Sequence, residues 1–284
     1  MKKFLRFFWG ILVVTGFVMA LLVMIHKIYW DTHEFVVTAC VSERTAIRAA
    51  NVAGLKIAEK GEFDAEDIGM QIVYQLAKRS IVKVVVKDAV GSGIIWRIED
   101  GVVIASNRHL LMKDVKAEIV FGSGESVIAD GIGYSQQYDI GFVRIPEEAV
   151  TDNILRNIYE AVPVLYDAES EDGKTAFIQE YSGKRVLQMG AVIDPGTVSF
   201  STGSVKGLTF VPLFNTNVLE TACFSKAGMS GGGVFDEGGR FLGMISGGEV
   251  PEEARKKEAE ISYSIPAALI ASEYEAITTE RNNQ

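Results

Sequence analysis

The chain has 284 residues, 48% of them hydrophobic and 10% aromatic, a composition that excludes a disordered protein and predicts a folded one. Its 28 basic residues against 37 acidic ones give a net charge of −9, which argues against a nucleic-acid binder, because such a domain needs a basic patch to neutralise phosphates. The mean hydropathy is nevertheless positive, at +0.18, and the excess hydrophobicity is concentrated at the N-terminus.

The first predicted element is a transmembrane helix over residues 7–25. These residues carry no charge, and at about 1.5 Å of rise each they reach across the hydrocarbon core of a bilayer. Lys2, Lys3 and Arg6 precede them, so the positive-inside rule places the N-terminus in the cytoplasm and the rest of the chain on the extracytoplasmic side, periplasmic or extracellular. Residues 1–30 are therefore assigned as a cytoplasmic tip and a membrane anchor.

Three other interpretations of this apolar run are weaker. A cleaved signal peptide has a shorter apolar region, about 7–15 residues, and a small-x-small site, and no such site closes this run directly. Lipidation at Cys40 is disfavoured because the polar stretch 26–34 separates that cysteine from the apolar run. A buried core helix is the weakest interpretation, since the run is uncharged, long and at the extreme N-terminus.

The portion beyond residue 30 is strongly acidic. It keeps 24 basic residues against 37 acidic ones, a net charge of −13, which favours solubility and repulsion from anionic lipid headgroups. Its two cysteines, Cys40 and Cys223, are too few for a disulfide framework and lack metal-ligand spacing. They either form one bridge or stay free thiols.

Residues 31–79 are predicted to form a helical stem between the membrane and the globular portion. Apolar residues recur there at three- or four-residue steps, as at Ile68, Ile72 and Leu76, which predicts two short amphipathic helices. Asp64 stands at the capping position of the second helix. The pattern does not decide whether the stem packs on the domain, on itself or on a neighbouring chain, so a homo-oligomer formed through the stem stays an open alternative.

Residues 80–272 consist largely of short β-branched runs separated by glycine. Runs such as IVKVVV, GSGIIWRI and GVVIAS, spaced about 8–12 residues apart, are typical of a sandwich or barrel. A polar, partly helical connector over residues 146–162 precedes a second series, which includes TAFIQEY, RVLQMGAVI and GTVSFS. This pattern predicts an all-β fold of two small barrels. The chain is expected to end in a brief helix over residues 266–277 that leads into a polar tail, assigned to residues 273–284.

Histidine is scarce in this sequence. Of three histidines, His26 and His33 lie at the membrane boundary, which leaves His109 as the only imidazole of the globular portion. A nucleophilic hydrolase needs a group that accepts and returns a proton near neutral pH, and histidine is the usual choice. A lone histidine after an apolar strand is more often structural, so the case for His109 depends on its companions.

Two further motifs supply those companions. Residues 228–232, GMSGG, present Ser230 in a bend of small residues, where the amides of Gly228 and Ser230 can point together as an oxyanion hole. A chain with 28 glycines also makes such turns without chemistry. Asp139 stands immediately before an apolar strand, where it is either a plain turn residue or a carboxylate that fixes the tautomer of His109.

The order His109, Asp139, Ser230, each in its own context, resembles the trypsin-like (chymotrypsin-fold) serine peptidases, and most of all their HtrA/Deg-type branch. The similarity covers roughly residues 80–272, including the GSGII strand, the run VVIASNRH, and the serine loop. It implies two packed six-stranded β-barrels and a serine endopeptidase that needs no cofactor and no metal. It also implies that Ser230 attacks, His109 transfers the proton, Asp139 orients His109, and the Gly228 and Ser230 amides form the oxyanion hole.

The chain departs from this family pattern beside the nucleophile. Met229 stands where the family usually has Asn or Asp, and Gly233 where it usually has Pro. Neither position transfers protons, so tolerance is expected. Cys223 is a rival nucleophile in principle, but its position favours a core thiol. The sequence ends soon after the resemblance does, so the PDZ domain common in the HtrA branch is expected to be absent.

The resemblance places the primary specificity pocket between Phe224 and Ser225 on one side and Ser246, Gly247 and Gly248 on the other. An aromatic residue at the base and no acid disfavour Lys or Arg side chains and suit small or medium apolar ones.

The sequence as a whole therefore predicts a membrane-anchored serine endopeptidase. Its expected partners are protein or peptide substrates near the outer membrane face and the lipid bilayer around residues 7–25, with no nucleic acid. Two alternatives belong to other classes: a catalytically silent barrel that serves as a tethered scaffold, and a chaperone-like module that binds unfolded segments without cutting them. All three triad side chains are present, which favours the peptidase.

Overall fold

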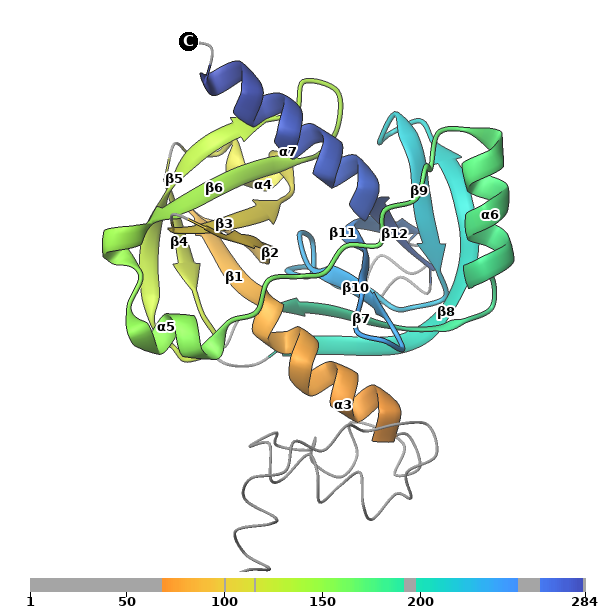
Figure 1. Cartoon of the computed structure of the whole chain (residues 1–284), viewed down its shortest axis with the longest axis horizontal. Helices are drawn as coiled ribbons and strands as arrows, with labels where there is room; N and C mark the ends of the chain where they lie inside the picture. Colours follow the sequence, from red (N-terminus) through yellow and green to blue (C-terminus); the bar gives the residue numbers. More distant parts are fainter. Residues whose placement is uncertain (1–67, 100, 115, 192–197, 250–260, 283–284) are drawn as a thin grey trace, which may run out of the picture. The chain divides into compact units, whose positions relative to one another are not determined.

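The structure is a computed structural model in which the described residues are 68–99, 101–114, 116–191, 198–249 and 261–282 (Figure 1). Within these ranges no helix is both long and apolar enough to cross a bilayer. The predicted transmembrane run at residues 7–25, the first stem helix and the cap at Asp64 lie outside the described residues.

The second predicted stem helix is present as α3 (Ile68–Ala77), but its buried face differs from the expected one. Its buried apolar residues are Met70, Val73 and Ala77. Leu76, expected on the apolar face, is 40% exposed. The ring of Tyr74 lies 4.9 Å from that of Phe200 on β8, a strand of the second barrel (Val198–Val211). Because the helix packs against the domain, the buried face is the one next to the predicted apolar face.

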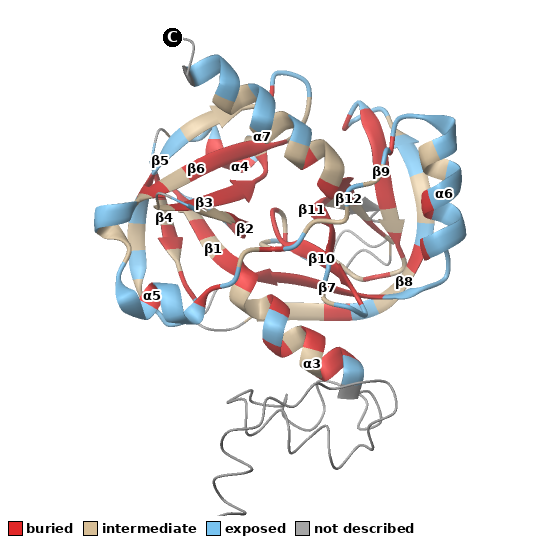
Figure 2. Cartoon of the chain, viewed as in Figure 1, coloured by how far each residue is buried: buried red, intermediate tan, exposed pale blue. Residues whose placement is uncertain are grey.

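The first barrel closes from six antiparallel strands in the order β1-β2-β3-β6-β5-β4. The strands are β1 (Ile81–Val86), β2 (Ala89–Ile98), β3 (Gly101–Ser106), β4 (Lys116–Val120), β5 (Ser126–Tyr134) and β6 (Gly141–Pro146). Alternation along β1 buries Val82, Val84 and Val86 in the barrel core, while Lys83 and Val85 between them stay half-buried. Most residues of this core are β-branched, as the strand prediction assumed. Figure 2 shows buried residues, in red, along strands of the barrel.

The second barrel repeats this arrangement in the order β10-β11-β12-β9-β8-β7. Its strands are β7 (Arg185–Ala191), β8 (Val198–Val211), β9 (Thr216–Thr221), β10 (Gly233–Asp236), β11 (Phe241–Glu249) and β12 (Ile261–Pro266). Buried side chains from several of these strands, such as Val186, Leu219 and Val234, form its core. The prediction of an all-β fold with two six-stranded barrels is confirmed.

The predicted connector runs through the short helices η2 (Glu147–Ala149) and α5 (Asp152–Asn157) and then bonds to both barrels. The Ala161 amide donates to the Ile95 carbonyl of the first barrel at 2.9 Å. The Phe241 amide of the second barrel donates to the Val162 carbonyl at 2.8 Å. The connector therefore ties the two barrels together along one seam.

The segment TAFIQEY, expected as a strand, belongs to the helix α6 (Glu171–Tyr181) instead. The Ser170 hydroxyl accepts a hydrogen bond from the Gly173 amide at 3.1 Å and caps the helix. Phe177 and Tyr181, four residues apart, lie on one face of it and stack at 4.8 Å in the core of the second barrel. Aromatic and β-branched residues raised the strand expectation, while the cap and the four-residue spacing favour the helix.

The expected polar tail, residues 273–284, is also wrong in part, because the helix α7 (Ala267–Asn282) continues through most of it. The ring of Tyr274 packs edge-on against Phe142 at 5.1 Å. A Cβ on Gly133 would lie 2.5 Å from the Ile277 side chain, which shows how closely the helix approaches β5. The helix contacts strands of both barrels (Figure 1), and these contacts stabilise a helix whose sequence looks polar.

Candidate active site

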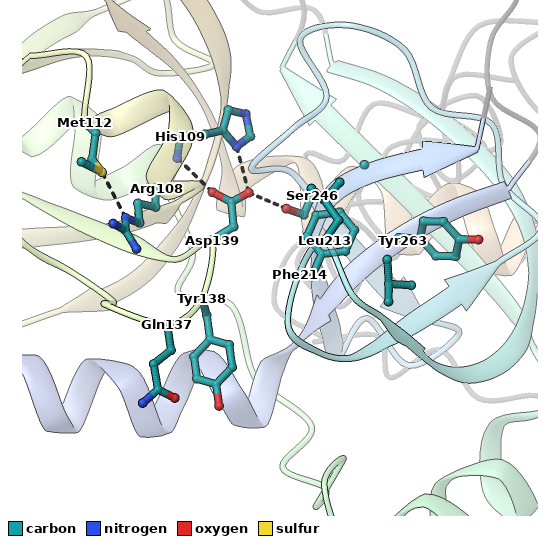
Figure 3. A pocket seen from close by; sticks show the side chains of 12 residues that line it. Arg108, His109, Met112, Gln137, Tyr138, Asp139, Leu213, Phe214, Ser246 and Tyr263 are labelled. Carbon is teal, nitrogen blue, oxygen red and sulfur yellow. Dashed lines mark hydrogen bonds and ion pairs between the residues drawn. The ribbon is translucent and has the colours of Figure 1, made fainter. Parts of the chain in front are cut away.

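His109 is carried by a short helix, α4 (Arg108–Leu111), that follows β3 directly. Its backbone amide donates to Asp139 Oδ1 at 2.9 Å, and its ring Nδ1 lies 2.8 Å from Asp139 Oδ2 (Figure 3). An ionised carboxylate can only accept hydrogen bonds, so Nδ1 carries the proton and Nε2 is left as the acceptor. This is the tautomer that a general base acting through Nε2 requires.

Asp139 lies two residues before the start of β6, and three hydrogen bonds converge on its carboxylate. Besides the two bonds from His109, the Ser246 hydroxyl donates to Oδ2 at 2.6 Å. Burial raises the pKa of Asp139, but the bonds from the His109 ring, the Ser246 hydroxyl and the His109 amide outweigh it and hold the pKa below its usual range. The carboxylate therefore stays ionised at neutral pH, as the tautomer argument needs.

The serine loop, residues 228–232, is held against the first barrel by Ser92 on β2. The Ser92 amide donates to the Ser230 carbonyl at 2.7 Å, and the Ser92 hydroxyl donates to the Gly228 carbonyl at 2.7 Å. Gly231 has a φ of 86°, and a Cβ there would lie 2.0 Å from the Ser92 carbonyl oxygen. Only glycine fits at this position, so the loop can dock closely.

Gly91, next to Ser92, shows how near the serine loop lies to the helix that carries His109. A Cβ on Gly91 would lie 2.5 Å from the Leu110 side chain and 3.1 Å from the Ser230 carbonyl oxygen. Ser230 is half-buried, and no hydrogen bond joins its hydroxyl to the His109 ring in the described part of the chain. Catalytic hydrogen bonds often tighten only when substrate binds, so the contact between Ser230 and His109 stays a prediction.

Three of the five backbone amides of the serine loop donate to backbone carbonyls. The amides of Met229, Gly231 and Gly232 donate to the carbonyls of Lys226, Ile245 and Met229, at 3.1, 2.8 and 2.9 Å. The amides of Gly228 and Ser230, the predicted oxyanion donors, donate to no backbone oxygen of the described residues. Gly228 has a φ of 92°, a backbone conformation that favours glycine and turns the chain between these two amides. Within the described residues these two loop amides therefore have no backbone acceptor, and their role as oxyanion donors stays a prediction.

The two family departures beside the nucleophile are apolar packing positions. Met229 is fully buried in the core of the second barrel, and a Cβ on Gly190 would lie 2.7 Å from its Cα. Gly233 opens β10, where a Cβ would lie 2.7 Å from the Phe235 ring and 2.8 Å from Ile94. Core packing therefore holds the loop at both positions.

A cavity of about 700 Å³ lies beside the His109–Asp139 pair, with walls from both barrels (Figure 3). Of the predicted pocket residues it includes Ser246 and Gly247. Its other apolar side chains, which sequence reasoning missed, are Met112, Tyr138, Val211, Leu213, Phe214 and Tyr263. Leu213 and Phe214 lie in the β8–β9 hairpin turn, and Leu213 is 85% exposed. The motif VPLFN, an apolar turn between two strands, is the sequence signal that could have found them.

Of the remaining predicted pocket residues, Phe224 and Ser225 do not line this cavity. Phe224 packs against the core of the second barrel, and its carbonyl accepts hydrogen bonds from Gln188 and Ser201. Ser246 was expected at the border of the pocket. Its hydroxyl instead donates to Asp139 and so forms part of the hydrogen-bonded group around His109 and Asp139.

The rival nucleophile Cys223 is 1% exposed, and burial raises the pKa of its thiol. Both effects oppose formation of the reactive thiolate, so Cys223 is a core residue as expected. Within the described ranges, no group of three or more His, Cys, Asp or Glu side chains could hold a metal ion.

The family model of the trypsin-like peptidase domain matches residues 91–244, more than half of the chain. The chain belongs to this family of serine-type peptidases, and the resemblance seen in the sequence is confirmed. No curated protein sequence matches the chain.

Among solved structures, the HtrA-type protease AlgW with a tripeptide is similar, with a TM-score of 0.58 and 14% identity over 72% of this chain and 62% of that one. The same protease with a decapeptide gives a TM-score of 0.57 and 14% identity over 73% and 66% of the two chains. The present chain thus spans less than two thirds of the length of these relatives. At this identity, the similarity establishes the shared fold.

Proposed function

We propose that this chain is a serine endopeptidase in which Ser230, His109 and Asp139 form the catalytic triad. The observation that carries the proposal is the convergence of three hydrogen-bond donors on an ionised Asp139, which leaves His109 Nε2 as an acceptor. A merely structural histidine would not need this tautomer. The family membership supports the same assignment.

In this mechanism Ser230 Oγ attacks the scissile carbonyl carbon while His109 Nε2 takes its proton. Asp139 stabilises the imidazolium that forms. The Gly228 and Ser230 amides donate to the oxyanion of the tetrahedral intermediate. His109 then gives its proton to the leaving amine, and water repeats the sequence to release the acyl group from Ser230. No step requires a cofactor.

The substrate is proposed to be a peptide segment with an apolar side chain. The cavity beside His109 offers Met112, Leu213, Phe214 and Tyr263 to such a side chain. Burying apolar surface there contributes about 25 cal/mol per Å², so a large side chain gains most. The similar AlgW structures are of that protease with a tripeptide and with a decapeptide, which supports a peptide substrate for this chain.

The location of the enzyme is proposed from the sequence. Residues 7–25 would anchor the chain in a bilayer with the catalytic domain on the extracytoplasmic side, which raises the effective concentration of substrates at that membrane face. Protease added to intact cells or spheroplasts should then digest the catalytic domain. Full protection of the domain would contradict this orientation.

Labelling by a fluorophosphonate, which reacts with activated serines, tests the peptidase assignment. The full chain should be labelled, Ser230→Ala should not, and Ser272→Ala, which changes an exposed serine on α7, should react like the wild type. Absence of Ser230-dependent labelling from a folded wild type would contradict the proposal. A folded chain that slows aggregation of unfolded proteins without being labelled would instead support the chaperone-like alternative.

A further inference from the structure

Asn107 occupies the cap position of α4, yet its side chain does not cap that helix. An asparagine at this position ordinarily accepts a hydrogen bond from an amide of the first turn. Here the amide of His109, the second residue of the helix, is taken by Asp139 Oδ1 at 2.9 Å. Asp139 thus performs the capping from another segment of the chain, and the side chain of Asn107 is free for other partners.

The side chain of Asn107 turns to the acid instead. Its Nδ2 lies 3.3 Å from the Asp139 carbonyl oxygen and 3.2 Å from Ser246 Oγ. Asn107 is completely buried, and its Oδ1 has no partner among the described residues. Both donors of the amide are thus committed to the Asp139–Ser246 pair, while its acceptor is left unpaired, an arrangement that costs free energy and serves no capping purpose.

The chemistry of the partners fixes the orientation of this amide. The Asp139 carbonyl only accepts hydrogen bonds, and the single proton of Ser246 Oγ is directed to Asp139 Oδ2 at 2.6 Å. Asn107 therefore faces lone pairs at both contacts, and only its NH2 group satisfies them. With the amide reversed, Oδ1 would face two acceptors.

We propose that Asn107 is a positioning residue of the triad, an inference that rests on the proposed peptidase function. One N–H of its amide holds the backbone of Asp139. The other occupies a lone pair of Ser246 Oγ and so keeps the proton of that hydroxyl on Asp139 Oδ2. Asn107 acts on the Asp139 carboxylate mainly through the Ser246 hydroxyl and does not touch the substrate. Without it, the Ser246 hydroxyl can rotate and the carboxylate loses a donor that stabilises its charge.

A double-mutant cycle tests this inference by the rate constant of Ser230 labelling with a fluorophosphonate. Asn107→Ala and Ser246→Ala should each slow labelling by about five- to tenfold, the scale of one net hydrogen bond. The double variant should be no more than about twofold slower than Ser246→Ala alone, because Asn107 acts largely through that hydroxyl. Asn217→Ala, which removes a buried asparagine from β9, should react within twofold of the wild type.

A second variant covers the case in which Asn107→Ala does not fold. Asn107→Asp keeps the shape of the side chain but replaces the two N–H donors with a carboxylate oxygen. Its labelling rate, divided by that of the wild type at the same pH, should rise as the pH falls, because protonation of the introduced acid restores an O–H donor. A ratio that does not change with pH would mean that the N–H donors of Asn107 are not used.

The outcomes distinguish this inference from the function on which it rests. Absence of Ser230-dependent labelling in the wild type overturns the peptidase proposal and, with it, this inference. In a wild type that is labelled, additive losses in the cycle, or a ratio for Asn107→Asp that does not depend on pH, overturn the role of Asn107 alone.

Discussion

Replacing Asp139 with asparagine tests the tautomer of His109 directly. Three donors meet the carboxylate: the His109 amide at Oδ1, and the His109 ring and the Ser246 hydroxyl at Oδ2. The asparagine has only one oxygen. The backbone amide cannot change its character, so the oxygen should stay opposite it. The new NH2 group would then face the imidazole and donate to Nδ1, which forces the proton onto Nε2 and removes the general base.

The size of the rate loss in Asp139→Asn distinguishes the loss of one hydrogen bond from the loss of the correct His109 tautomer. Loss of one charge-assisted hydrogen bond costs about 1.5–3 kcal/mol, or roughly tenfold to a hundredfold in rate. Loss of the tautomer costs about ten-thousandfold, close to 5.5 kcal/mol in activation free energy. We expect the larger loss for Asp139→Asn in fluorophosphonate labelling near neutral pH.

The control for this experiment is Asp130→Asn, which makes the same change at an exposed aspartate on β5 and should leave the rate within twofold of the wild type. Thermal unfolding of Asp139→Asn should still be cooperative, since the substitution keeps the shape of the side chain. A loss of less than a hundredfold in a folded variant would refute the tautomer argument and would mean that Asp139 only adds electrostatic stabilisation.

Because the pKa of Asp139 is lowered on folding, its ionised form stabilises the protein at neutral pH, and this contribution is lost as the pH falls through the folded-state pKa. The difference in Tm between wild type and Asp139→Asn should therefore shrink below about pH 4. Ser92→Ala removes the donor to the Gly228 carbonyl and should lower kcat about tenfold with little change in KM, measured on a cleaved peptide. Gly231→Ala should destabilise the fold by more than about 3 kcal/mol in urea unfolding, since it combines a positive φ with a backbone clash. Phe214→Ala should raise KM for substrates with large apolar side chains at least about fivefold and leave alanine-rich substrates nearly unchanged.

The strands and the order of the candidate triad could be predicted because each leaves a local signal. Alternating β-branched residues mark a strand whose one face is buried, as along β1. The helices were harder to predict from the sequence. Residues 175–181 carry side chains that are common in strands. Their helical spacing becomes evident only in the structure, where Phe177 and Tyr181 pack together in the core of the second barrel. The face of α3 was misassigned because its partner, Phe200, lies more than a hundred residues away in the sequence.

In the candidate site, too, some residues could be predicted from the sequence and others could not. Residues that donate or accept protons could be picked out by type, since one imidazole stood in the globular portion. The residues that hold them in place, Ser246 and Asn107, could not be predicted. They act through hydrogen bonds between segments separated by up to 139 residues. Leu213 and Phe214 were missed for a related reason: an apolar turn looks like a misplaced core residue until the hairpin is seen to reach the cavity.

The candidate site lies at the seam between the two barrels, so both barrels contribute residues to it. The first barrel contributes Asn107, His109 and Asp139, and the second contributes Ser246 and the serine loop. A hydrogen bond that crosses the seam, such as Ser246 to Asp139, forms only when the barrels are correctly docked. The connector holds that docking by backbone bonds, and Ser92 adds one bond from its amide and one from its hydroxyl. Docking of the barrels and the low pKa of Asp139 are therefore linked, because the Ser246 hydroxyl that helps to lower this pKa comes from the second barrel.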